Sequence, residues 1–276
     1  MSRWEPMVLR AGSANKRKID LPFCRLWIAG DRCSPCAALR AAHMLTAAGP
    51  QTYIPARGKP LAAGSVMTTP IADSDVLLVV DIQNDFCPSG QLPVPHGDDV
   101  VPIINHLARR FRQVVLTQDW HPAGHHSFAS SHPGRHPFET VTLPYGQQIL
   151  WPDHCVQGTP GAQFHSGLQI PHAALVLRKG FRSTIDSYSA FYENDRKTPT
   201  GLAGYLRERG LTRLFVAGLA FDFCVRYSAE DARREGFAVT IIEDACRGID
   251  VAGSVAATRE SFAALNVAAV TADAVD

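Results

Sequence analysis

Residues 214–225 read Leu214-Phe215-Val216-Ala217-Gly218-Leu219-Ala220-Phe221-Asp222-Phe223-Cys224-Val225, an apolar run that leads into a cysteine. The pattern predicts a buried strand at 213–218 and an amphipathic helix from residue 222 to residue 235. Free N–H groups and the positive dipole end at a helix start stabilise negative charge, so they would favour the thiolate of Cys224 and a developing oxyanion. The stretch therefore indicates nucleophilic cysteine chemistry at a strand-to-helix junction.

Two other apolar runs end in ionisable side chains. Residues 76–80 lead into Asp81, and residues 174–178 lead into Lys179. Because catalytic groups collect at the carboxyl ends of parallel strands, we expect Asp81, Lys179 and Cys224 to converge. Each alone has an ordinary interpretation, as a loop-capping acid, a solvated amine or a core thiol. Together they favour a base, a cation and a nucleophile at one site.

From residue 75 onward, apolar strands alternate with amphipathic helices. The predicted strands cover 76–81, 113–117, 174–178, 213–218, 237–242 and 267–271, and the predicted helices cover 98–111, 200–209, 222–235 and 254–264. Near-continuous Val, Ile and Leu strands between helices predict an α/β fold. We expect a three-layer, doubly wound sheet of about six mostly parallel strands in one domain at 74–276.

The first 73 residues differ in composition from the rest of the chain. Residues 1–66 hold ten Lys or Arg against three Asp or Glu. We interpret residues 1–73 as a basic, poorly ordered extension or as a mis-assigned start, since translation from Met67 would still give the whole domain. Cys33 and Cys36 have the spacing of a metal or redox pair, but no second pair follows them.

Composition bounds the location and the partners of the protein. No apolar run approaches the length of a membrane span, and residues 1–30 lack the hydrophobic core of a signal peptide. Seven cysteines without a disulfide-like framework favour reduced thiols and a cytoplasmic location. The net charge of +1 is close to balance, and we expect no nucleic-acid or membrane partner. Homo-oligomers are compatible with the sequence.

Six of the eleven histidines lie between positions 121 and 154, in one long connection. Asp119 and His121 follow a strand and lie on the same side of extended backbone, and the segment Trp-Pro-Asp-His ending at His154 adds another imidazole. One carboxylate and two imidazoles leave coordination positions open, as a catalytic divalent metal requires. Zinc, iron and manganese all accept this set of ligands.

The other histidines of this connection have less distinctive surroundings. His126 lies where a fourth ligand could reach, and the sequence leaves its role open. For His125, His132 and His136 we expect solvated loop side chains.

Six motifs carry a resemblance to a known family. They lie at 80–86 (Val-Asp-Ile-Gln-Asn-Asp-Phe), 119–122 (Asp-Trp-His-Pro), 151–158 (Trp-Pro-Asp-His-Cys-Val-Gln-Gly), 179–180 (Lys-Gly), 186–191 (Asp-Ser-Tyr-Ser-Ala-Phe) and 218–220 (Gly-Leu-Ala). From about residue 74 to its end, the chain resembles the nicotinamidase/pyrazinamidase group of the isochorismatase-like cysteine hydrolases. The resemblance implies catalytic roles for Asp81, Lys179 and Cys224, and metal-ligand roles for Asp119, His121 and His154.

The resemblance also implies how a substrate would be held. It suggests a cis peptide between Leu219 and Ala220 and an oxyanion hole formed by the amides of Ala220 and Cys224. The substrate-binding residues that it implies are Phe86 and Trp151 as aromatic walls, with Gln83 and Tyr188 near the pocket. Flat walls suit a heteroaromatic ring, whose two faces they can cover. Two positions depart from the family pattern, Phe221 and Phe223, and either could narrow the pocket.

The implied activity is hydrolysis of nicotinamide to nicotinate and ammonia through a thioester, in NAD salvage, with pyrazinamide as a second substrate. The implied cofactor is one divalent metal ion, with zinc preferred over iron or manganese. An amidase for N-carbamoyl or ureido substrates is an alternative that needs no anchor for a ring nitrogen. An isochorismatase would not need the cysteine. A non-catalytic redox sensor would keep Cys224 as an oxidisable thiol and release no ammonia.

Overall fold

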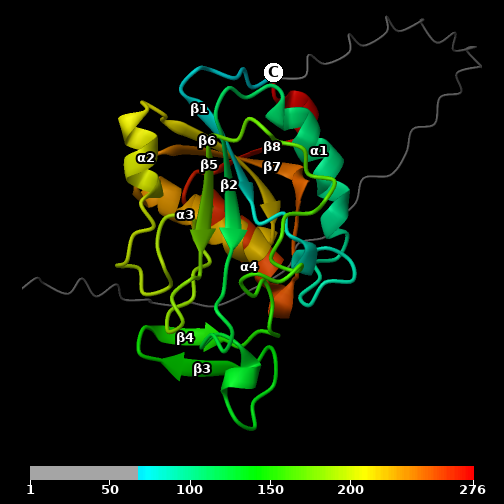
Figure 1. The fold of residues 1–276 in the computed structure, drawn as a ribbon. Coiled ribbons are helices and arrows are strands. Elements are labelled where there is room, and N and C mark those ends of the chain that lie inside the picture. Colours follow the sequence, from blue (N-terminus) through cyan, green and yellow to red (C-terminus); the bar gives the residue numbers. More distant parts are fainter. Residues whose placement is uncertain (1–67) are drawn as a thin grey trace, which may run out of the picture. The chain divides into compact units, whose positions relative to one another are not determined.

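The computed structural model describes residues 68–276 (Figure 1). The predictions made for the basic extension, for a start at Met67 and for the Cys33–Cys36 pair lie outside the described residues. Within residues 68–276, no helix has both the length and the apolar character needed to cross a bilayer.

A six-stranded sheet forms the centre of the fold. Its strands are β1 (Asp75–Val80), β2 (Val114–Asp119), β5 (Leu175–Lys179), β6 (Arg213–Leu219), β7 (Ala238–Arg247) and β8 (Ala268–Val270). The order is β5-β2-β1-β6-β7-β8, and every neighbouring pair is parallel. The chain winds outward in one direction from β1 and in the other from β6. Their junction is the topological switch point, where ligands bind in folds of this type.

Helices cover both faces of this sheet. They are α1 (Val100–Ala108), α2 (Leu202–Glu208), α3 (Arg226–Arg234) and α4 (Ser254–Ala264). Alternate residues of β1 divide between two cores: Leu77 packs in a core with Ile104 of α1, whereas Leu78 shares the other with Leu206 of α2 and Ala229 of α3. Burial on both faces explains why β1 reads as a continuous apolar run. The predicted three-layer α/β fold is confirmed.

Local differences from the sequence prediction concern short elements. A two-stranded antiparallel hairpin, β3 (Thr140–Leu143) and β4 (Gly146–Ile149), lies in the histidine-rich connection. Its residues are mostly polar or half-exposed, so they gave no strand signal. The predicted helix at 222–235 begins as a π-helical turn at Phe221–Val225 and continues as α3. Short 3₁₀ turns occupy Asn84–Phe86, Gly97–Asp99, Ala129–Ser131, Val251–Gly253 and Ala272–Ala274.

The described chain begins before the expected domain boundary at residue 74. Thr69 donates a backbone hydrogen bond to Ala274 (2.6 Å), and Ile71 donates one to Asp276 (2.6 Å). Thr69 and Ile71, which were expected to belong to the extension, are therefore hydrogen-bonded to residues at the end of the chain.

Candidate active site

Three strand ends bring the expected catalytic side chains together. Asp81 follows β1, Lys179 ends β5, and Cys224 lies in the π turn after β6. Lys179 Nζ lies 2.8 Å from Asp81 Oδ2 and donates a 3.3 Å hydrogen bond to Cys224 Sγ. Carboxylate oxygens of Asp81 and Asp119 and the sulfur of Cys224 all lie within 4.8 Å of one another.

Lys179 is the cation of this cluster. Its side chain is fully buried, which by itself would lower the pKa of its ammonium group, but Asp119 and Asp81 hold that pKa well above its usual value. It also donates hydrogen bonds of 3.0 Å to Asp119 Oδ1 and to the carbonyl of Ser187. Lys179 therefore remains charged and is held from three sides.

Asp81 has the properties of a base that becomes protonated during turnover. Burial raises the pKa of its carboxyl group, and the charge of Lys179 opposes that rise. Thr117 donates a 2.6 Å hydrogen bond to Oδ1. Lys179 Nζ lies 2.8 Å from Oδ2, and the sulfur of Cys224 lies close enough for the carboxylate to accept its proton. A raised pKa makes the carboxylate a stronger base.

The resting state of Cys224 differs from the thiolate that its helix position favours. Burial raises the pKa of the Cys224 thiol well above its usual value, and neighbouring Lys179 only partly opposes this effect. The free group is therefore a thiol, and it would have to lose its proton before the sulfur could act as a nucleophile. Asp81 lies within reach of that proton.

The backbone at the π turn offers donors to a developing negative charge. The peptide between Leu219 and Ala220 is cis, as the family resemblance implied. Ala220 and Cys224 both line the pocket, and Cys224 lies in the first helical turn, where N–H groups lack partners within the helix. These two amides are suited to an oxyanion hole.

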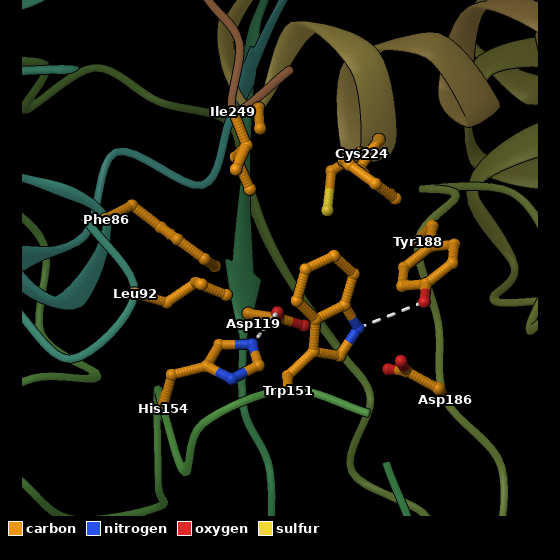
Figure 2. Close-up of a pocket in the computed structure, with 11 residues that line it drawn as sticks. Phe86, Leu92, Asp119, Trp151, His154, Asp186, Tyr188, Cys224 and Ile249 are labelled. Carbon is orange, nitrogen blue, oxygen red and sulfur yellow. Dashed lines mark hydrogen bonds and ion pairs between the residues drawn. The ribbon is translucent and has the colours of Figure 1, made fainter. Parts of the chain in front are cut away.

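Figure 2 shows the pocket beneath the sulfur of Cys224, with the indole of Trp151 and the ring of Tyr188 beside it. Trp151 Nε1 donates a 3.0 Å hydrogen bond to the hydroxyl of Tyr188, which fixes the indole plane. Phe86 lies across the pocket from the Tyr188 side. The two expected aromatic walls, Phe86 and Trp151, line a mostly apolar pocket. Its lining also includes Leu92, Asp186, Phe223 and Ile249.

The two phenylalanines that depart from the family pattern have different surroundings. Phe223 lines the pocket and meets the indole of Trp151 edge-on, with ring centroids 4.9 Å apart. Phe221 packs instead against Phe262 of α4, in the core on the far side of the turn. Only Phe223 therefore narrows the pocket.

The predicted metal ligands form a compact group beside this pocket. Asp119 Oδ2 lies 3.3 Å from His121 Nε2 and 3.5 Å from His154 Nε2, and all three side chains are buried. The group presents one carboxylate and two imidazoles to a single point.

The hydrogen bonds of the two imidazoles fit a divalent ion. His121 Nδ1 donates to the carbonyl of Gly180 (2.9 Å), and His154 Nδ1 donates to the carbonyl of Pro152 (2.8 Å). Each bond to a carbonyl fixes the proton on Nδ1, so Nε2 carries the lone pair toward Asp119. Within residues 68–276, His121 Nε2 is buried without a hydrogen-bond partner. These residues could therefore hold a divalent metal ion.

The remaining histidines of the connection require one correction. The expectation that His125 is solvated is wrong, because its side chain is fully buried. Its Nε2 donates to the carbonyl of Arg182 (2.8 Å), and its Nδ1 pairs with the hydroxyl of Ser127 (2.7 Å). Both ring nitrogens are thus used within the fold. His126 is exposed and belongs to none of the potential metal-binding groups found within residues 68–276.

Gln83 lies next to a pocket residue, Asp119. Its side chain does not line the pocket but is buried behind Asp119, where it pairs with the backbone of that residue. Two apolar pocket residues were not expected from the sequence, for different reasons. Ile249 follows the end of β7 and so shares the strand-end position of the catalytic groups. Leu92 lies in a loop without a distinguishing pattern.

An isochorismatase domain model matches residues 75–274 of the chain. The chain belongs to the isochorismatase domain family. Within this family it is 54% identical over 183 residues to the nicotinamidase of Acinetobacter baylyi, covering 66% of this chain and 86% of that relative.

Solved structures of isochorismatase relatives agree with this assignment. The nicotinamidase and pyrazinamidase of Acinetobacter baumanii superposes with a TM-score of 0.73 at 51% identity, covering 73% of this chain and 98% of that one. A pyrazinamidase of Pyrococcus horikoshii in complex with zinc has a TM-score of 0.59 at 34% identity, covering 72% and 99%.

Proposed function

We propose that the protein is a metal-dependent cysteine amidohydrolase that converts nicotinamide to nicotinate and ammonia, in NAD salvage, and that also hydrolyses pyrazinamide. The observation that carries the proposal is the meeting of Asp81, Lys179 and Cys224 at one end of an aromatic pocket. The nicotinamidase of Acinetobacter baylyi and the pyrazinamidase of Pyrococcus horikoshii, both relatives of this chain, support the choice of substrates.

The first half of the reaction forms a thioester. Asp81 takes the proton of Cys224, Lys179 stabilises the resulting thiolate, and the sulfur attacks the carboxamide carbon. The amides of Ala220 and Cys224 donate to the oxyanion of the tetrahedral intermediate. Asp81 then gives its proton to the amide nitrogen as the carbon–nitrogen bond breaks, and ammonia leaves.

The second half releases the acid. Asp81, again a carboxylate, takes a proton from water, whose oxygen attacks the thioester carbon. The second oxyanion uses the same pair of backbone donors, and its collapse breaks the carbon–sulfur bond. The proton returns from Asp81 to the sulfur of Cys224. Amide and water are thus converted to carboxylic acid and ammonia, with the protein unchanged.

Substrate orientation is the role that we assign to the rest of the pocket. Phe86, Trp151 and Phe223 would cover the ring, and Tyr188 would fix the indole. Asp119, His121 and His154 would hold a divalent ion, for which zinc is our choice because the Pyrococcus horikoshii relative was solved with zinc. When bound, that ion supplies a Lewis-acidic anchor for a ring nitrogen.

We also propose that residues 74–276 form the catalytic domain and that the protein acts in the cytoplasm. Cys87, Cys155, Cys224 and Cys246 are free thiols within the described part of the chain, as a reducing compartment would maintain.

A panel assay tests the function. Purified protein is given nicotinamide, pyrazinamide, benzamide and an N-carbamoyl amino acid, with and without a chelator, and ammonia release is measured. We expect rapid ammonia release from nicotinamide and pyrazinamide, whose ring nitrogen can bind the ion, and loss of that release after chelation. Benzamide and the N-carbamoyl compound lack this ring nitrogen, so we expect much slower release from them. Fastest release from the N-carbamoyl substrate would instead favour the ureido amidase, and no release from any amide would favour the redox sensor.

A further inference from the structure

The loop that follows β1 carries a buried amide in contact with a candidate metal ligand. Gln83 is completely buried. Its Oε1 accepts the backbone N–H of Asp119 (2.7 Å), and its Nε2 donates to the carbonyls of Asp119 (2.8 Å) and Ala162 (2.9 Å). One side chain thus pairs with both backbone groups of Asp119, as a neighbouring strand would. The peptide that carries this ligand cannot turn without breaking these bonds.

Two residues further along, Asp85 makes a comparable contact with the loop of a second ligand. Its Oδ2 accepts the N–H of Cys155 (2.7 Å), the residue that follows His154, and its Oδ1 accepts the N–H of Gln91 (3.2 Å). A Cβ atom on Gly161 would lie 2.2 Å from Asp85 Oδ2, so only glycine allows the carboxylate this position. Asp85 therefore fixes the backbone immediately after His154.

The third ligand is connected through the same residue, Cys155. The carbonyl of Cys155 accepts the N–H of His121 (3.0 Å), and the carbonyl of His121 accepts the N–H of Gln157 (2.8 Å). The backbones of all three ligands are therefore joined to the β1 loop by hydrogen bonds. Two side chains of that loop, Gln83 and Asp85, are the points of attachment.

We infer that Gln83 and Asp85 are positioning residues that set the affinity of the metal centre. The inference rests on the metal site of the proposed function. Asp85 does not belong to the group of potential ligands around Asp119, and both polar atoms of the Gln83 amide are bonded to backbone groups, so both residues act through the ligand backbones. Ligands that are held in place before binding lose less freedom when the ion binds, and outer contacts of this kind contribute substantially to metal affinity.

Asn84 provides a matched control within the same loop. Its Nδ2 donates to the carbonyl of Pro160 (2.8 Å), a bond in an exposed position that touches no ligand backbone. Asn84→Ala therefore removes one hydrogen bond from the loop without releasing Asp119 or His154.

The test measures binding of zinc alone to the full chain, by competition with a fluorescent zinc chelator. Gln83→Met keeps the side-chain length and removes all three hydrogen bonds. Asp85→Asn keeps the shape but cannot accept from both N–H groups. For both variants we expect the zinc Kd to rise by about 10- to 100-fold, while Asn84→Ala matches the wild type.

Thermal unfolding of the metal-free variants separates a general loss of stability from a loss of affinity. If Gln83→Met does not fold, Asp85→Asn carries the test, because it keeps the shape of the side chain and introduces no charge. A zinc Kd equal to that of the wild type in the folded Gln83 and Asp85 variants overturns the inference, whatever their metal-free stability. A wild-type chain that binds zinc but releases no ammonia would overturn the proposed function and leave this inference standing.

Discussion

Lys179 Nζ donates a hydrogen bond of 3.0 Å to Oδ1 of Asp119, so the catalytic cluster and the candidate metal centre share one carboxylate. The other oxygen of Asp119 faces the Nε2 atoms of His121 and His154 at 3.3 and 3.5 Å. A change of charge in the catalytic cluster therefore changes the electrostatic potential at the metal centre, and the reverse also holds.

Replacing Lys179 with methionine should affect both stability and turnover. The substitution leaves Asp81 and Asp119 buried without their common cation, and breaking a buried ion pair in this way costs about 3–5 kcal/mol. Ammonia release should fall by at least about 100-fold, because the thiolate of Cys224 loses its stabilising charge. Denaturant unfolding and steady-state rates measure the two effects. The control is Arg178→Met, an exposed neighbour on the same strand. Equal effects of both variants would contradict the role of Lys179.

The pH dependence of kcat/KM should report the raised pKa of Asp81. Burial raises that pKa above its ordinary value of 3.8. As the pH falls through the raised pKa, Asp81 becomes protonated and can no longer accept the proton of Cys224. The rate should therefore decline on the acid side at a pH above that ordinary value. An acid limb at or below the ordinary aspartate pKa would show that another group is the base.

Removal of one metal ligand should be distinguishable from removal of a nearby histidine. His121→Ala deletes a buried Nε2 that faces Asp119, so bound zinc should be lost and nicotinamide should bind more weakly. His126→Ala, in the same loop but exposed, should keep both properties. Metal content by mass spectrometry and KM for nicotinamide provide the readouts. Full metal content in His121→Ala would mean that the ligand set is wrong.

Deletion of residues 1–66 should leave ammonia release unchanged. The shortened chain keeps Thr69 and Ile71, which donate backbone hydrogen bonds to Ala274 and Asp276 near the end of the chain. Further deletion through residue 72 removes those bonds and should lower the midpoint of thermal unfolding. If deletion of residues 1–66 removes most of the ammonia release, the extension contributes to the active site.

The fold could be predicted from sequence because its signals are local and repeated. β1 and β6 are buried on both faces, so their apolar runs are continuous and their ends are conspicuous. Asp81 directly follows β1 and Cys224 lies in the turn after β6, which made the location of this cluster predictable. The hairpin at 140–149 could not be found, because its short strands are half-exposed and alternate too weakly.

Side-chain environments were less predictable than positions. His125 and His126 are adjacent, yet one is fully buried and the other exposed, because His125 makes a tertiary contact with Arg182 as well as a local one with Ser127. Gln83 looked like a pocket residue because it belongs to a motif that contains Asp81. Its amide is instead directed to the backbone of a neighbouring strand, a choice that depends on sheet order rather than on local pattern.

The central claim is that Cys224 attacks the carboxamide, and its most direct test is to trap the acyl-enzyme. Wild-type protein is mixed with nicotinamide, quenched in acid within one turnover and analysed by peptide mass spectrometry, with Cys224→Ala as the control. The account predicts a nicotinoyl group on the peptide that contains Cys224, and neither adduct nor ammonia release in the variant. Ammonia release by Cys224→Ala at the wild-type rate would contradict it.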